Sequence, residues 1–261
     1  MPGSAPVFAS TFSQAGGLYT AGADATIISW DVPAPDADVY TDYSPSHRLS
    51  VAKDHTDSIW MLDAHPTNDL LVSGGADGSY KFWDISDPSN VAVKQSHASA
   101  NGAISCGQFL PSDAGKLLLG NQCGNVSLLD VETGQSVLEF PTEGDGKLLS
   151  LKAHRTMSLA VGAYSDKSIR FFDITTGKLV HSLVAHQAAV SCIDFDPSGL
   201  YMVSVGHDRS IRMWDVGSKG CVFENTTHRH KYDEAIHAVA FHPTVAKFAT
   251  AGADAVVKIF T

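Results

Sequence analysis

The chain has 261 residues, of which 44% are hydrophobic and 18% are charged, and its formal net charge is −10. This composition is typical of a globular domain with no disordered tail. The acidic net charge and the lack of any run of Lys or Arg make nucleic acid an unexpected partner. No apolar run approaches the ~18 residues of a membrane span, so we expect no direct membrane insertion.

One short motif recurs along the chain: a small or hydrophobic residue, a large apolar residue and then an aspartate. Its copies lie at 29–31, 82–84, 128–130, 171–173 and 213–215, and a sixth copy at 259–261 ends in Thr261. The steps between copies are at or slightly above the period of roughly 40–45 residues that is typical of WD-repeat blades.

Each copy predicts a small antiparallel sheet. In the second copy, strands at 58–64, 70–74 and 80–85 are separated by a Pro-containing turn at 65–69 and by an Asp-Gly hairpin at 76–78. Asp-Gly between two apolar runs is a strong hairpin signal because the turn needs positive φ. Equivalent hairpins lie at 23–25, 165–167, 207–209 and 253–255, and fourth strands are expected near 47–51, 91–95, 135–140, 178–183 and 220–225.

The predicted fold is therefore an all-β WD-repeat β-propeller that forms one domain over residues 1–261. Six blades are recognisable, at about 5–51, 52–95, 96–140, 141–183, 184–225 and 226–261. The last blade lacks a fourth strand, and residues 1–6 are too few to supply one. Since open sheet edges favour aggregation, we expect an incomplete ring that is poorly stable on its own.

Two copies carry His, Ser, Asp and Trp at matching offsets, which is compatible with either an acyl-transfer triad or a structural device. The complete sets are His55, Ser73, Asp77, Trp83 and His186, Ser204, Asp208, Trp214, and partial sets are His228, Thr250, Asp254 and Thr20, Asp24, Trp30. An enzyme needs one nucleophile, whereas this pattern repeats and has no G-x-S-x-G elbow. Buried polar groups need partners, so we interpret the sets as structural tetrads like those of WD-repeat proteins and predict no catalytic residue and no enzyme.

Departures from the pattern predict weaker blades. The third copy has Cys123 at the Asp position and Leu129 at the Trp position, and the fourth has Gly162 and Phe172 at the Ser and Trp positions. Blades three and four should therefore be the least well fastened. A further set of histidines, which we interpret as ordinary turn residues, consists of His65, His154 and His242.

No cofactor or metal site is expected. The sequence has neither a phosphate-binding loop nor a dinucleotide-binding glycine pattern. The histidine-rich segment 228–237 contains Arg and Lys, which repel a cation, and His228 already has a place in a tetrad. The four cysteines lie far apart, which predicts a reducing compartment and no disulfide; they are Cys106, Cys123, Cys192 and Cys221.

Three features are candidate partner contacts. An acidic insertion at 33–45 contains Tyr40 and Tyr43, and a long loop at 228–234 contains Lys231 and Tyr232. Loops on a rigid scaffold often carry recognition, although solvated loops would give the same pattern. Trp60 has no tetrad role and is either a core residue or an exposed aromatic anchor.

Several segments resemble one family. EAIHAVAFHPTVAKFATAGADAVVKIF, DKSIRFFDITTGKLVHSLVAHQAAV, DPSGLYMVSVGHDRSIRMWDV and TAGADATIISWDV are similar, in this family's order, to the C-terminal propeller of striatins. The resemblance covers almost the whole chain. It implies a seven-bladed propeller, of which one blade would be absent, and a scaffold without catalytic activity. Striatins are regulatory subunits of protein phosphatase type 2A that bring this phosphatase together with germinal-centre-type kinases and Mob-like proteins.

The resemblance also sets limits on this segment. The family's coiled-coil, calmodulin-binding and caveolin-binding parts lie upstream of its propeller, and this sequence has no heptad run or basic amphipathic helix. Oligomerisation and calmodulin binding are therefore expected of the family rather than of this segment. We expect a cytoplasmic location, with membrane association through partners or upstream segments. The alternative function is a peptide-reader or adaptor module of a ubiquitin-ligase or chromatin complex.

Overall fold

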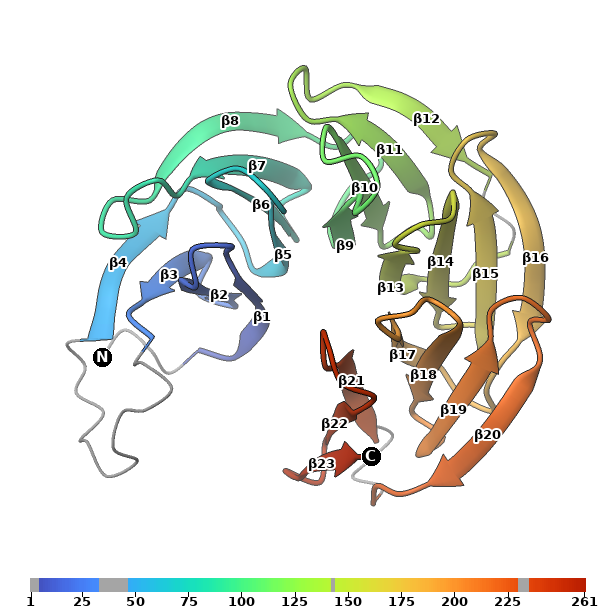
Figure 1. The fold of residues 1–261 in the computed structure, drawn as a ribbon. Helices are drawn as coiled ribbons and strands as arrows, with labels where there is room; N and C mark the ends of the chain where they lie inside the picture. The colour runs from blue at the N-terminus through green and yellow to red at the C-terminus, as the bar shows by residue number, and fades with distance from the viewer. Residues whose placement is uncertain (1–4, 33–46, 142–143, 230–234) are drawn as a thin grey trace.

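The computed structural model describes residues 5–32, 47–141, 144–229 and 235–261. Every regular element in these ranges is a β-strand, and the strands form five four-stranded sheets and one three-stranded sheet. The sheets are arranged as blades around a central opening (Figure 1). The all-β propeller with six blades is therefore confirmed. Among the described residues, no helix is long and apolar enough to cross a membrane.

The first three blades occupy the N-terminal half of the chain. The first contains β1 (Val7–Phe12), β2 (Leu18–Gly22), β3 (Thr26–Trp30) and β4 (Arg48–Lys53). The second contains β5 (Ile59–Ala64), β6 (Leu70–Gly75), β7 (Ser79–Asp84) and β8 (Ala92–Ala98). The third contains β9 (Ile104–Phe109), β10 (Lys116–Asn121), β11 (Val126–Asp130) and β12 (Ser136–Phe140).

The last three blades follow in chain order. The fourth contains β13 (Leu148–Ala153), β14 (Leu159–Tyr164), β15 (Ser168–Asp173) and β16 (Lys178–Val184). The fifth contains β17 (Val190–Phe195), β18 (Tyr201–Gly206), β19 (Ser210–Asp215) and β20 (Cys221–Thr226). The sixth contains β21 (Ile236–Phe241), β22 (Phe248–Gly252) and β23 (Val257–Phe260).

Each blade is an antiparallel meander whose first strand lies innermost and whose last strand lies outermost (Figure 1). Because strand direction alternates, the connections fall on two opposite faces. The turns between first and second and between third and fourth strands share one face, which we call the turn face. The hairpins between second and third strands and the loops that enter the next blade share the other, which we call the hairpin face.

The apolar core lies between neighbouring blades. Five buried clusters occupy the five interfaces; the one between the third and fourth blades, for example, includes Leu118, Leu148 and Phe172. The six blades form an open arc in Figure 1, with the first and sixth blades at its ends. Apolar side chains are exposed on these two blades, namely Val7, Phe8, Phe12, Val257 and Ile259.

Candidate interaction surfaces

In the second blade, four predicted residues form one hydrogen-bonded chain. His55 precedes β5, Ser73 lies on β6, Asp77 in the following hairpin and Trp83 on β7. His55 Nδ1 lies 2.8 Å from Asp77 Oδ2, and His55 Nε2 lies 2.7 Å from Ser73 Oγ. Trp83 Nε1 donates to Ser73 Oγ at 2.8 Å. The chain of bonds fastens the loop entering the blade to its hairpin.

The fifth blade repeats this geometry. His186 Nδ1 lies 3.1 Å from both carboxylate oxygens of Asp208, and His186 Nε2 lies 2.7 Å from Ser204 Oγ. Trp214 Nε1 donates to Ser204 Oγ at 2.8 Å. Ser73 and Ser204 are both 0% exposed, and each hydroxyl already accepts an indole N–H. A substrate cannot reach either oxygen, so the geometry is that of a fold-stabilising device rather than of a nucleophile.

The sixth blade keeps three of the four groups. His228 Nδ1 lies 3.0 Å from Asp254 Oδ1, and His228 Nε2 lies 2.8 Å from Thr250 Oγ1. Phe260 occupies the Trp position and has no N–H to donate, and its ring stacks on Phe248 with 4.8 Å between ring centroids. An apolar ring contact thus replaces the last hydrogen bond of the set.

The first blade has a shorter set. Trp30 Nε1 donates to Thr20 Oγ1 at 2.7 Å. Asp24 accepts hydrogen bonds from the backbone and the hydroxyl of Thr26 instead of from a histidine. Of the three residues predicted for this set, Trp30 and Thr20 are hydrogen-bonded to each other, whereas Asp24 bonds to Thr26.

Blades three and four are fastened by other residues. In the fourth blade Asp166 pairs with Arg170, whose guanidinium carbon lies 3.9 Å from the ring centroid of Tyr164. In the third blade the side chain of Asn121 accepts from the backbone N–H of Asn125 at 3.1 Å, while Cys123 is exposed. Arg170 stands four residues after the hairpin Asp, a position at which other blades also carry a basic residue, namely Lys81, Arg212 and Lys258.

Acidification is expected to destabilise the protein through the tetrads. Burial lowers the pKa of His55 below 6.5, so its neutral form is favoured in the fold, and this stability is lost as pH falls below that value. Burial raises the pKa of Asp77, but hydrogen bonds from Ser79, His55 and Thr56 outweigh burial and lower this pKa to about 2. A second loss of stability therefore follows as the pH falls from 3.8 towards 2. Urea unfolding across a pH series measures both losses.

The matched variant for that experiment is Asp77→Asn, which cannot ionise. It should be less stable than the wild type near neutral pH, yet its stability should change less between about pH 4 and pH 2. Equal acid sensitivity of wild type and variant would show that Asp77 does not contribute to it.

The histidines that we interpreted as ordinary turn residues have a larger role, so that interpretation was wrong for two of them. His65 and His154 are buried, and each Nδ1 accepts backbone N–H groups of its own turn. Each Nε2 donates to a carbonyl of the next blade at 2.9 Å, Ala114 for His65 and Gly199 for His154. His242 has the same turn contacts but is exposed in the sixth blade.

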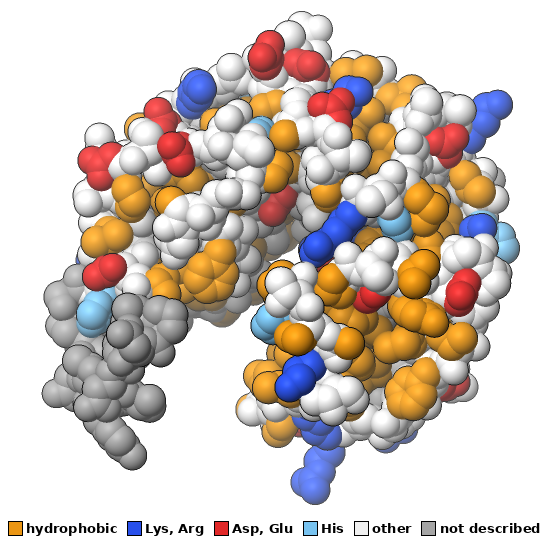
Figure 2. All heavy atoms as spheres, in the orientation of Figure 1, with side chains coloured by type: hydrophobic (Ala, Val, Ile, Leu, Met, Phe, Trp, Pro, Cys, Tyr) orange, Lys and Arg blue, Asp and Glu red, His pale blue; other side chains and the backbone are white. Residues whose placement is uncertain are grey.

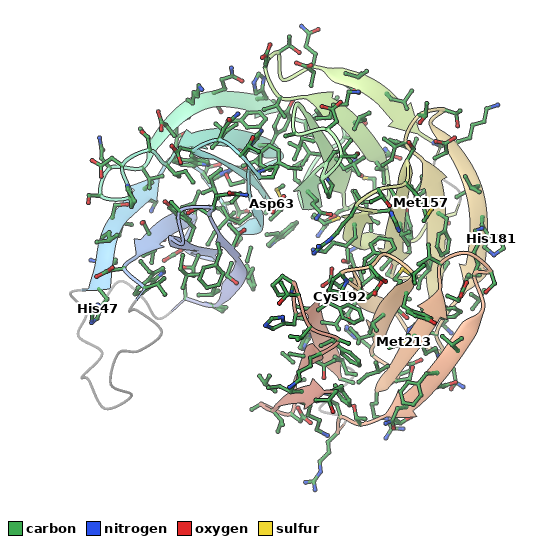
Figure 3. The ribbon with its side chains drawn as sticks, viewed as in Figure 1. His47, Asp63, Met157, His181, Cys192 and Met213 are labelled. Carbon is green, nitrogen blue, oxygen red and sulfur yellow. The ribbon has the colours of Figure 1, made fainter. Side chains whose placement is uncertain are left out.

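The innermost strands carry a second kind of link between blades. Asp63 Oδ2 accepts from Phe109 N at 2.8 Å, and Asp194 Oδ2 accepts from Phe241 N at 2.7 Å. Figure 3 shows Asp63 on the inner side of the arc. Burial raises the pKa of Asp63 to about 6. Lys152 stands at the position in β13 that Asp63 has in β5. Burial acts to lower the pKa of Lys152, but the nearby Asp194 carboxylate holds that pKa above its ordinary value.

A β-bulge in each innermost strand adds one residue to the wall of the central opening, near the hairpin face. Bulges commonly re-aim a side chain. The bulged residues are Phe8, Trp60, Ser105, Leu149, Ser191 and His237. Trp60 is half-buried at such a bulge, so it is neither a core residue nor a fully exposed anchor. The other candidate contacts lie outside the described residues: Tyr40, Tyr43, Lys231 and Tyr232.

The turn face is acidic. One aspartate begins each turn between third and fourth strands: Asp31, Asp84, Asp130, Asp173 and Asp215. Hydrogen bonds from the turn backbone lower the pKa of Asp84, Asp130 and Asp215, which keeps these carboxylates ionised.

An apolar groove of about 430 Å³ lies between the fifth and sixth blades, lined by Tyr201, Met213, Phe241, Val245, Phe248 and Phe260 among others. Figure 2 shows hydrophobic side chains gathered over this part of the arc. Exposed apolar surface rimmed by polar groups is typical of protein contacts.

The fold and its buried tetrads define a WD-repeat β-propeller, a class that acts by binding. The family described as WD domain, G-beta repeat matches residues 45–84, 177–215 and 221–261. Within that class, the chain is a WD-repeat propeller of the striatin family. It is 39% identical to human (Homo sapiens) Striatin-4 over 246 residues, covering 93% of this chain and 33% of the relative.

Two further relatives agree. Striatin-3 of Bos taurus is 36% identical over 262 residues, covering 98% of this chain and 33% of the relative, and Striatin of Rattus norvegicus is 36% identical over 248 residues, covering 93% and 32%. The chain thus spans about a third of the length of the curated relatives it matches. These similarities point to a scaffold or regulatory protein that binds other proteins and is not catalytic.

Proposed function

We propose that the chain is a scaffold segment of a signalling assembly that joins protein phosphatase type 2A to germinal-centre-type kinases and Mob-like proteins. The similarity to striatins over almost the whole chain carries the proposal. The geometry supports a binding role because the polar sets are buried, while the turn face, with its apolar groove, and the hairpin face offer two chemically different surfaces. A scaffold needs such separate surfaces to hold partners at once.

Affinity purification from cell lysate with this chain as bait tests the proposal. Recovery of phosphatase type 2A subunits together with a kinase of this class is the expected result. The matched control is Trp83→Ala, which damages the fold and should lose every partner together. Recovery of neither enzyme by the folded chain would contradict the proposal. We propose a cytoplasmic location for the assembly, which fluorescence microscopy of the tagged chain would test.

A peptide-reader module is the second candidate function. The observation that favours it is the half-buried Trp60, which stands at the same bulge position as the exposed Phe8 and Leu149 of the first and fourth blades. Aromatic and aliphatic side chains at such a place suit a short peptide with an apolar anchor. If the purification yields short-motif ligands alone, and if Trp60→Ala abolishes their capture, this second function replaces the first.

Trp60→Ala is expected to have a small effect on the unfolding free energy, roughly 1 kcal/mol, because the side chain is only partly removed from water. Two tryptophans are half-buried, Trp30 and Trp60, whereas Trp83 and Trp214 are buried. Acrylamide quenching should therefore fall in the Trp60→Phe variant, and the remaining accessible emission should come from Trp30. Unchanged quenching in that variant would place the accessible tryptophan elsewhere.

A further inference from the structure

The hairpin face carries exposed positive charge over blades four to six. Four exposed basic residues lie on its loops: Lys147, Lys167, Arg209 and Arg229. None of them forms an ion pair with any residue in the described ranges. In a chain with a net charge of −10, the described exposed charges of this region are mostly positive, which favours an acidic partner.

Most described acidic groups of this region are already engaged. Asp166 pairs with Arg170, Asp208 with His186 and Asp254 with His228. Two exposed carboxylates lie among the described residues of these loops, Asp145 and Asp166, and Asp166 is paired with Arg170. Four exposed cations therefore stand against one exposed carboxylate without an ion pair in the described ranges. We call the four basic residues the basic loop surface.

Backbone hydrogen bonds join these loops into one continuous edge. Ser165 N donates to Lys147 O at 2.9 Å, and Ala185 N donates to Lys167 O at 2.8 Å. Further along, Thr227 N donates to Arg209 O at 3.4 Å. The basic residues of three successive blades are thus held on a connected frame, which limits the entropy that a ligand would have to remove on binding.

Two of the basic residues occupy a backbone conformation that costs them free energy. Lys167 has φ 73° and Arg209 has φ 68°, at the hairpin position where the second and third blades have Gly78 and Gly124. Glycine adopts this conformation without the steric cost that a long side chain incurs. The first and sixth blades have Ala25 and Ala255 in this conformation, so the hairpin itself requires it. The conformation fixes the direction in which the Lys167 and Arg209 side chains leave the hairpins.

A buried guanidinium lies beside the same loops. Arg170 is 4% exposed, and its Nη1 has no hydrogen-bond partner among the described atoms. A Cβ placed on Gly144 would lie 3.3 Å from Arg170 Nη2. The guanidinium of Arg170 therefore lies next to the loop that precedes Lys147. Buried polar groups without partners are rare, so Nη1 is a hydrogen-bond donor that remains unused within the described part of the chain, although Asp166 balances the charge of the guanidinium.

We infer that the basic loop surface docks an acidic segment of a partner protein. Guanidinium and ammonium groups bind carboxylates through charge-assisted hydrogen bonds, and guanidinium can do so with two parallel bonds. A long polyanion such as nucleic acid is disfavoured because the acidic remainder of the chain repels it. The inference rests on the proposed scaffold function only in taking a protein as the partner.

The test measures fluorescence anisotropy of a fluorescein-labelled glutamate-rich peptide with the full chain. A peptide with Gln in place of Glu and vesicles of phosphatidylserine are run beside it. We expect the glutamate peptide to bind and its affinity to fall as salt is added. The Lys167→Glu/Arg209→Glu variant should bind at least about tenfold more weakly.

Two further variants keep the result interpretable. Lys167→Gly/Arg209→Gly removes both charges and also relieves the backbone, so it should fold at least as well as the wild type and still lose affinity. Lys178→Glu/Lys247→Glu makes the same change of charge on the turn face and should leave affinity within about twofold. Equal loss in this control, equal binding of the Gln peptide, or binding of vesicles alone would each overturn the inference. None of these outcomes depends on whether phosphatase or kinase is recovered.

Discussion

Replacing Trp83 with alanine is expected to lower the free energy of unfolding by about 3–5 kcal/mol. Trp83 is 1% exposed, packs in the cluster between the first and second blades, and donates its indole N–H to Ser73. The substitution therefore creates a cavity and also leaves the buried Ser73 hydroxyl with one partner fewer. Urea denaturation followed by circular dichroism measures the change.

The matched control is Trp60→Ala, which removes the same side chain from a half-buried bulge outside the tetrads. Its loss of stability should be clearly smaller. If the two substitutions destabilised the protein equally, the tetrad and its cluster would have no special role in the stability of the second blade.

The second large effect concerns the link between blades four and five. His154→Ala should cost roughly 1–3 kcal/mol, because it leaves the buried carbonyl of Gly199 without its donor and removes the edge-on contact with Phe195. Gly199 has φ 76°, and a Cβ there would stand 2.5 Å from His154 Nε2, so the close approach needs glycine. Thermal unfolding of the purified variant measures the loss.

His242→Ala provides an internal control, since His242 has the same turn contacts but is exposed. We expect it to change stability by no more than about 0.5 kcal/mol. A comparable loss in both variants would mean that the histidine acts within its own turn and that the bond to the next blade adds nothing.

The tetrads were accessible from sequence because their spacing repeats. His55 and His186 stand at the same offset from their serines, so a period of one blade exposes the pattern even without coordinates. The hairpin aspartate of every blade except the third is equally visible in the sequence, because a tight turn restricts the residues that it accepts. Local spacing therefore predicted both the fold class and the residues that meet inside a blade.

Contacts between blades were not accessible in the same way. Asp63, Gln108 and Asp194 each accept a backbone N–H of the following blade, yet their residue types differ and the bonded groups are more than 40 residues away in the chain. Which blades touch at these points depends on the curvature of the arc. The same is true of His65 and His154, whose partners belong to the next blade.

The sequence pattern did not indicate the bulges, for a different reason. An extra residue in the innermost strand shifts the alternation of apolar and polar side chains by one position, so the sequence pattern at Trp60 fits both a core and a surface residue. Only the register of β5 against β6 separates the two.

We propose that the chain works by holding different proteins at the same time. Size-exclusion chromatography of the purified chain with purified phosphatase type 2A and a germinal-centre-type kinase tests it most directly. The expected result is one peak that contains all three components. Two binary complexes that exclude each other, or no complex with the chain, would contradict it.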